Sequence, residues 1–324
     1  MSTITSKRPA TLETPAGIIW HRPLLALAAS MAILAVVCAV GLAIDDRSLL
    51  GVNVWEKPLK FAISTVIYAV TWSWLIGQLT RFRRAAWWAG TVSASMLAIE
   101  RAIIAGAAAY GITSHFNVSS PLNAAMWSTM AISITVLWVA TFVVSIILFR
   151  NPLGDRARGL AIRAGALIAR AGMGLAFLMT GPTAAQLDNW QGIAGAHTVG
   201  LADGGPGIPI LGWSTVAGDL RIPHFVGMHA LQVIPLALIL IEFASRRVVA
   251  MRDVNVRHRL VAIVTGTYTA VLAILTWQAM RGQSIVLPDI ATISATSVVG
   301  VVAVVATIAA LLSPRRKAEL TLAG

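Results

Sequence analysis

Eight long apolar stretches dominate the sequence, near residues 23–44, 59–79, 86–110, 124–149, 162–186, 223–244, 260–280 and 289–312. Each has about the 20 residues that an α-helix needs to cross the roughly 30 Å hydrocarbon core of a bilayer. Inside hydrocarbon a backbone must satisfy its own hydrogen bonds, which leaves helices and closed barrels as the spanning structures. The stretches therefore predict an all-α membrane protein, a bundle of eight transmembrane helices.

The charged residues agree with a membrane protein. Only 12% of the residues are charged, whereas about a quarter are charged in an ordinary soluble domain. The net charge of +12 could suggest a nucleic-acid-binding protein. Such proteins gather their basic residues on one polar face, but here Lys and Arg fall in short groups between apolar stretches. We therefore expect the lipid bilayer as a partner, and no nucleic acid.

The same basic groups orient the chain. Most of the 25 Lys and Arg residues precede the first stretch or follow the second, fourth, sixth and eighth stretches. Loops with an excess of Lys and Arg remain in the cytoplasm. We predict that both termini are cytoplasmic, and that tails at 1–22 and 313–324 flank one transmembrane domain at 23–312. This topology predicts a multi-pass membrane protein.

The largest connection on the outer side is a glycine-rich loop over about 187–222. Its sequence DGGPG at 203–207 is typical of tight turns. A loop of this length is usually either functional or disordered, and its Trp, Ile and Leu content argues against disorder. We predict an ordered cap over the outer helix ends. A cap with a structural role alone is the alternative interpretation.

Two charged residues lie inside the third apolar stretch. Glu100 and Arg101 are on the order of 10–15 Å below its outer end, from the rise of a helix. Charges at this depth are costly and are candidates for function. Neighbours in a helix point about 100° apart, so we expect partners from other helices, with Asp219, Arg221 and Lys60 as the nearest candidates. A purely structural ion-pair network is the alternative.

Histidines gather on the outer side of the predicted topology. Imidazole is a ligand for zinc, copper and iron, which makes a transition metal or haem a candidate cofactor. No short ligand motif such as HxxxH is present, so histidines with hydrogen-bonded, structural roles are the alternative. The candidate metal ligands are His115, His197, His224 and His229. We expect the other two histidines, His21 and His258, to be solvated among basic residues.

We predict that the outer polar residues form one pocket beneath the cap. Arg221 and the start of the sixth stretch would add positive potential, which favours a small-molecule or anionic ligand at the outer face. Pro235 predicts a kink in the same stretch. The candidate pocket residues are Glu100, Arg101, His115, Asn117, His197, Asp203, Asp219, Arg221, His224, His229, Gln232 and Arg281. The sequence assigns no catalytic role to any of them.

Several strings also carry a family resemblance. They are WEKPLKF, SHFN, DGGPG, GWS and GDLRIPHFVGMHALQ, of which the last is the most specific. Together they resemble an uncharacterised family of bacterial multi-pass integral membrane proteins, over roughly residues 54–285. The resemblance implies a multi-pass protein of the bacterial inner (plasma) membrane. It transfers no site residue, because no activity is established for the family.

The sequence leaves three functions open. One is a metal- or haem-binding membrane enzyme with an outward-facing site. Another is a small-solute or proton-coupled transporter that uses Glu100 and Arg101, although no inverted repeat is visible. The third is a sensor or assembly factor whose cap binds a partner. Whether the protein is an enzyme, which ligand it binds and how it oligomerises all stay open at this point.

Overall fold

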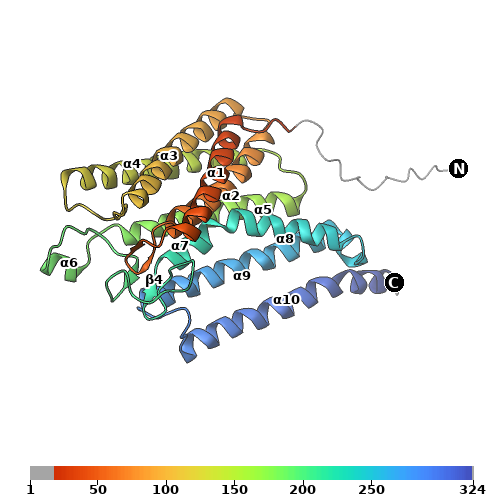
Figure 1. Ribbon diagram of the computed structural model, residues 1–324. Helices are drawn as coiled ribbons and strands as arrows, with labels where there is room; N and C mark the ends of the chain where they lie inside the picture. The colour runs from red at the N-terminus through yellow and green to blue at the C-terminus, as the bar shows by residue number, and fades with distance from the viewer. Residues whose placement is uncertain (1–17, 323–324) are drawn as a thin grey trace.

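The computed structural model describes residues 18–322, and from 314 onward it describes the backbone alone. The tails predicted at 1–22 and 313–324 therefore lie largely outside the residues whose side chains are described. Long helices make up most of the chain (Figure 1). They are α1 (Arg22–Ile44), α2 (Glu56–Gly77), α3 (Arg83–Ala109), α4 (Pro121–Phe149), α5 (Arg156–Gly174), α9 (Val254–Met280) and α10 (Ile290–Leu322).

The described residues contain seven helices that are long and apolar enough to cross a membrane. For one of them, the candidate span begins with α5 and runs from Arg156 to Asp188. The number becomes eight if the bent pair α7 (Arg221–Met228) and α8 (Ala230–Ala244) forms one span. The prediction of a mostly helical protein with several helices that could span a membrane is thus confirmed. Shorter elements connect them: η1 (Leu175–Met179), α6 (Ala184–Asp188) and η2 (Val249–Arg252).

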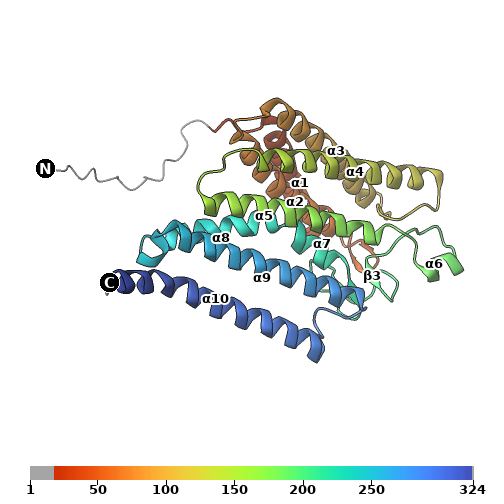
Figure 2. The same cartoon turned by 180° about the vertical axis from the view of Figure 1, so that it is seen from behind.

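Within residues 18–322 the strands form two small antiparallel pairs in the connections. β1 (Ser48–Leu49) pairs with β2 (Val52–Asn53), and β3 (Thr198–Val199) pairs with β4 (Gly218–Asp219). Both pairs lie at the end of the bundle where α6 lies, and the last residues of α10 lie at the opposite end (Figures 1 and 2).

Connections that are far apart in the sequence meet at this end. Arg47 Nη1 donates a hydrogen bond to the Ala109 carbonyl at 2.8 Å, and the Val118 amide donates to the Gly192 carbonyl at 2.8 Å. The loop after α9 joins them, because the Ser284 hydroxyl lies 3.5 Å from the Ser214 carbonyl. The loops at 45–55, 110–120, 180–220 and 281–289 therefore form one continuous layer, which we call the cap layer.

The bend between α7 and α8 is 47° and falls at His229. The kink that Pro235 predicted in this stretch is therefore present, and Pro235 itself lies inside α8. The helices also pack closely beside the bend. A Cβ atom on Gly172 of α5 would lie 2.2 Å from the backbone carbon of Gly227, so the two backbones touch where α5 crosses α7.

His21 is buried, which corrects the expectation that it is solvated. It precedes α1, where its Nδ1 accepts a hydrogen bond from the Leu24 amide and its Nε2 lies 2.9 Å from the Trp87 carbonyl. Burial lowers the pKa of His21 although the Trp87 carbonyl opposes this. The ring therefore fastens the start of α1 to α3. His258 is half-buried, with Nδ1 3.2 Å from the Arg156 carbonyl.

Candidate functional site

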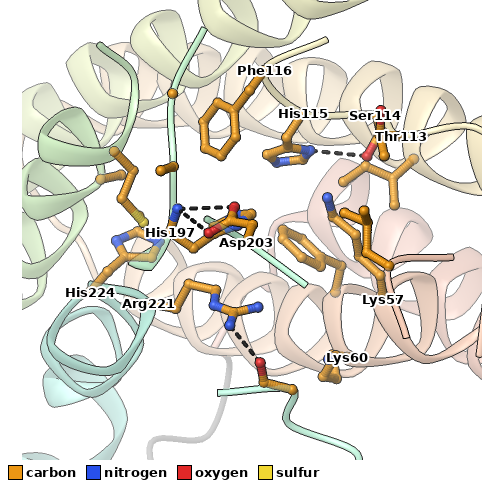
Figure 3. Close-up of a pocket in the computed structure, with 18 of the residues that line it drawn as sticks. Lys57, Lys60, Thr113, Ser114, His115, Phe116, His197, Asp203, Arg221 and His224 are labelled. Atoms are coloured by element: carbon orange, nitrogen blue, oxygen red, sulfur yellow. Dashed lines mark hydrogen bonds and ion pairs between the residues drawn. The ribbon is translucent and has the colours of Figure 1, made fainter. Parts of the chain in front are cut away.

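A cavity of about 1370 Å³ lies under the cap layer and extends between the helices. Side chains of α2, α3, α4, α5, η1 and α7 line it, together with the loop at 110–120 and the glycine-rich loop (Figure 3). Its volume exceeds the roughly 300–1,000 Å³ of ordinary small-molecule pockets. Eight of the predicted pocket residues line it: Glu100, Arg101, His115, His197, Asp203, Arg221, His224 and His229.

The other four predicted pocket residues do not line this cavity. Asn117 is occupied within its own loop, where its amide donates to Thr113 Oγ1 at 2.9 Å. Arg281 pairs with Asp289 at 2.8 Å. Gln232 reaches α2, with Nε2 3.3 Å from Thr71 Oγ1. Asp219 is buried beside the site, where it holds Arg221.

The four histidines do not form the predicted metal site. In the described part of the chain, no three His, Cys, Asp or Glu side chains are placed to share a metal ion. The ring centres of His115 and His197 are 6.4 Å apart, and Nδ1 of His224 is engaged by the Gly172 carbonyl at 2.8 Å. A haem needs only one imidazole ligand, so this result does not test haem binding, which stays a prediction.

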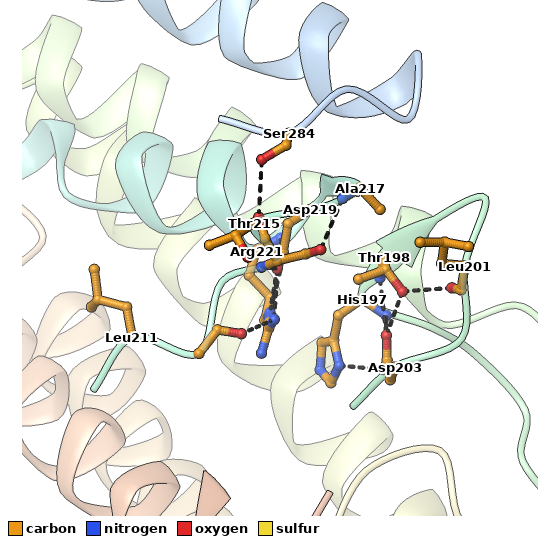
Figure 4. Close-up of polar contacts among 12 residues, drawn as sticks. His197, Thr198, Leu201, Asp203, Leu211, Thr215, Ala217, Asp219, Arg221 and Ser284 are labelled. Carbon is orange, nitrogen blue, oxygen red and sulfur yellow. Dashed lines mark hydrogen bonds and ion pairs between the residues drawn. The ribbon is translucent and has the colours of Figure 1, made fainter. Parts of the chain in front are cut away.

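His197 and Asp203 form a close pair at the edge of the cavity. His197 Nδ1 lies 2.6 Å from Asp203 Oδ2. The carboxylate also accepts hydrogen bonds from the His197 amide at 2.9 Å and from the Thr198 amide at 3.0 Å (Figure 4). Burial opposes ionisation of Asp203, but these hydrogen bonds outweigh it and hold the pKa of Asp203 well below its usual range.

The same contacts fix the proton on His197. Burial lowers the pKa of His197, although Asp203 opposes this, so the ring is neutral near pH 7. An ionised carboxylate at Nδ1 selects the tautomer that carries its proton there. Nε2 then keeps its lone pair, and it has no hydrogen-bond partner among the residues that the structure describes.

His115 belongs to an aromatic wall of the cavity. Its ring centre lies 5.9 Å from that of Phe61, 6.0 Å from that of Phe116 and 5.8 Å from that of Trp127. Ser114 Oγ is 3.0 Å from its Nδ1. Burial lowers the pKa of His115 well below its ordinary value, and nearby Lys57 contributes in the same direction. This histidine is therefore neutral.

Three cationic side chains reach the same end of the cavity. Arg221 is held by Asp219 at 2.6 Å, and Lys60 Nζ donates to the Leu211 carbonyl at 2.9 Å. Lys57 points toward the space between His115 and Asp203 (Figure 3). Neither lysine has a carboxylate within ion-pair distance in the part of the chain that is described.

Sequence reasoning did not place the two lysines in the pocket. Lys57 and Lys60 are three residues apart in α2, so they share one face of the helix. Their position on the predicted outer side, where basic residues are scarce, was a signal that could have identified them.

Glu100 and Arg101 form an ion pair in the cavity wall. Arg101 Nη2 lies 2.7 Å from Glu100 Oε2, and each residue is only 5% exposed. The expected partners were Asp219, Arg221 and Lys60, which contact other groups instead, so that expectation was wrong. The long side chains bend toward each other although their Cα–Cβ bonds diverge. Arg101 Nε has no hydrogen-bond partner within the described residues.

The rest of the cavity wall is mostly apolar. Its aromatic and sulfur-containing members between the helices include Tyr68, Trp138, Met173, Phe177 and Met228. The cavity therefore combines cationic groups near the cap layer with an apolar interior between the helices.

Comparisons with protein families, with curated proteins and with solved structures find no match for this chain. The resemblance over residues 54–285 accordingly stays a prediction, and the geometry of the cavity carries the functional argument.

Proposed function

We propose that this protein binds a small amphiphile with an anionic head group in a cavity that opens toward the outer side of a bacterial plasma membrane. One observation carries the proposal: the cavity has cationic side chains at the cap layer and apolar walls between the helices. A ligand that satisfies both halves has a charged end and a hydrocarbon part.

The head-group end is defined by Lys57, Lys60 and Arg221. Lys57 has neither an ion-pair partner nor a hydrogen-bond acceptor among the described residues, so its ammonium group is available to a ligand. Arg221 presents a guanidinium whose orientation Asp219 fixes. Planar guanidinium groups and ammonium groups together are a common recognition set for phosphate and carboxylate oxygens.

The hydrocarbon end is defined by the helices. Tyr68 of α2, Trp138 of α4 and Met173 of α5 meet there, and each lines the cavity. Methionine adapts its shape to irregular apolar ligands. Burial of an alkyl chain contributes about 0.8 kcal/mol per methylene group, which makes this wall the main source of affinity.

The orientation rests on the basic residues. With eight spans and both termini in the cytoplasm, the cap layer lies on the outer side, where few Lys and Arg are expected. Lys57, Lys60 and Arg221 depart from this pattern, and ligand binding gives a reason for their presence.

A transporter is the second candidate, and the break at His229 favours it. The helix pair α7–α8 bends beside the cavity, and His229 itself lines it. Broken helices next to a buried charged pair such as Glu100–Arg101 recur in transporters. Vesicle uptake of the bound amphiphile would separate transport from binding.

A fluorescence titration tests the binding proposal. Trp127, Trp138 and Trp213 line the cavity, so dodecyl phosphate should change the tryptophan emission of the purified protein in a saturable way. The double variant Lys57→Met/Lys60→Met should weaken binding at least tenfold. Arg84→Met, at an exposed residue at the opposite end of α3, is the control. Equal binding by the double variant and the wild type would overturn the proposal.

A further inference from the structure

Asp203 makes one contact, to the imidazole of His197, that is not needed to hold the loop in its turn. Asp203 already accepts hydrogen bonds from the amides of His197 and Thr198 and from the Thr198 hydroxyl, at 2.9–3.0 Å, and these fasten the turn. The imidazole adds a contact of 2.6 Å to the same carboxylate. Its effect is to orient the ring and to keep the lone pair on Nε2, in a side chain that lines the cavity.

A two-stranded sheet places this ring beside a cation. Thr198 of β3 pairs with Asp219 of β4, and the Leu220 amide donates to the His197 carbonyl at 2.9 Å. Arg221 follows directly, and its guanidinium is bound by Asp219 (Figure 4). The imidazole and the guanidinium are therefore held on one rigid unit at the head-group end of the cavity.

The charge at this end suits an anion. Lys57 and Lys60 lack carboxylate partners within the described chain, whereas Arg221 is paired with Asp219. Asp203 is ionised beside the neutral ring of His197, so the two lysines leave this end with a net positive charge. A phosphate monoester is anionic at pH 7, and its oxygens accept hydrogen bonds from ammonium and guanidinium groups.

We propose, building on the amphiphile-binding function above, that His197 is a nucleophile that hydrolyses an amphiphilic phosphate monoester. His197 Nε2 forms a bond to phosphorus while the bond from phosphorus to the alcohol oxygen breaks. The leaving oxygen takes a proton from the Lys57 ammonium group. Asp203 stabilises the positive charge on the imidazole through Nδ1–H, and Arg221 and Lys60 contact the phosphoryl oxygens.

Water completes the reaction. A water oxygen attacks the phosphorus of the phosphohistidine, the N–P bond breaks, and the Lys57 amine takes the proton from the water. The products are the free alcohol and inorganic phosphate, and His197 and Lys57 return to their initial states. The reaction needs no oxidant, reductant or further substrate.

Phosphate release from dodecyl phosphate, with butyl phosphate as the short-chain comparison, tests the inference. The purified wild-type protein should release phosphate from dodecyl phosphate at least tenfold faster than from butyl phosphate. Rapid alkaline quenching, which preserves an N–P bond, should show phosphate on His197. His197→Gln should lose at least 100-fold in rate and still bind dodecyl phosphate by fluorescence, which shows that it is folded. His258→Gln, far from the cavity, is the matched control.

The outcomes separate the two proposals. If the wild-type protein binds dodecyl phosphate and releases no phosphate, the nucleophile is wrong and the binding function stands. If His197→Gln releases phosphate at the wild-type rate, the inference is also overturned. If the wild-type protein binds no dodecyl phosphate, both proposals fail together. Equal rates for butyl and dodecyl phosphate would overturn the requirement for an amphiphile.

Discussion

The guanidinium carbon of Arg101 lies 4.4 Å from the centre of the Phe61 ring, while Nη2 of the same side chain pairs with Glu100. Cation–π contact and ion pairing therefore hold one charged group in the wall of an otherwise apolar cavity. Phe61 follows Lys60 in α2, so this contact also links the charged pair of α3 to the helix that carries the cationic end of the cavity.

Removing one charge of this pair should destabilise the fold. Glu100→Gln strands Arg101 in a buried site, and the cost of such a change is about 3–5 kcal/mol. We expect a clearly lower melting temperature in detergent. Glu242→Gln, which removes the partner of the more exposed Arg158, should cost less than about 1 kcal/mol. Equal melting temperatures for wild type and Glu100→Gln would contradict a buried pair.

The crossing of α5 and α7 gives a second stability prediction. Gly172→Ala would place a Cβ against the backbone of Gly227, so either the helices separate or α5 distorts. Overpacking of this kind costs about 1–3 kcal/mol, and backbone atoms yield less readily than side chains. Gly174→Ala meets nothing within 4 Å and should leave the melting temperature unchanged or slightly raised. Similar values for both variants would argue against the close crossing.

Acid should weaken the fold through His115. Burial keeps its pKa well below the ordinary value of about 6.5, so the unfolded chain binds a proton in a pH range where the folded protein does not. Stability is then full above pH 6.5 and falls as the pH drops toward the folded-state pKa. His115→Gln should flatten the decrease in melting temperature between pH 7.5 and 5.5, whereas His258→Gln should not. An unchanged slope in His115→Gln would contradict this account.

Reporter fusions test the orientation. Fusions after Arg84, Arg158 and Arg259 should report the cytoplasm, because the adjoining loops are basic. Fusions near Ser119 and Gly204 should report the outer side, since both residues lie in the cap layer. An inverted signal at either outer position would reject the topology.

The sequence was sufficient for the helices and for much of the site. Apolar length predicted the long helices, and the glycines of the 187–222 loop predicted a cap with tight turns. The sequence did not predict the partners of individual side chains. Asp203 bonds its near neighbours His197 and Thr198, and His224 bonds the Gly172 carbonyl, so the expected metal site does not form. The close crossing of α5 and α7 at Gly172 and Gly227 joins two segments that are far apart in the sequence, so no local pattern predicts it.

The most direct test of the central claim is photolabelling with dodecyl phosphate that carries a diazirine at the end of its alkyl chain. The account predicts labelled peptides that contain Tyr68, Trp138 or Met173, and loss of that label in the presence of excess dodecyl phosphate. Label confined to exposed residues of α10 such as Val298 and Val302, with no effect of the competitor, would show that the probe dissolves around the protein and would contradict binding in the cavity.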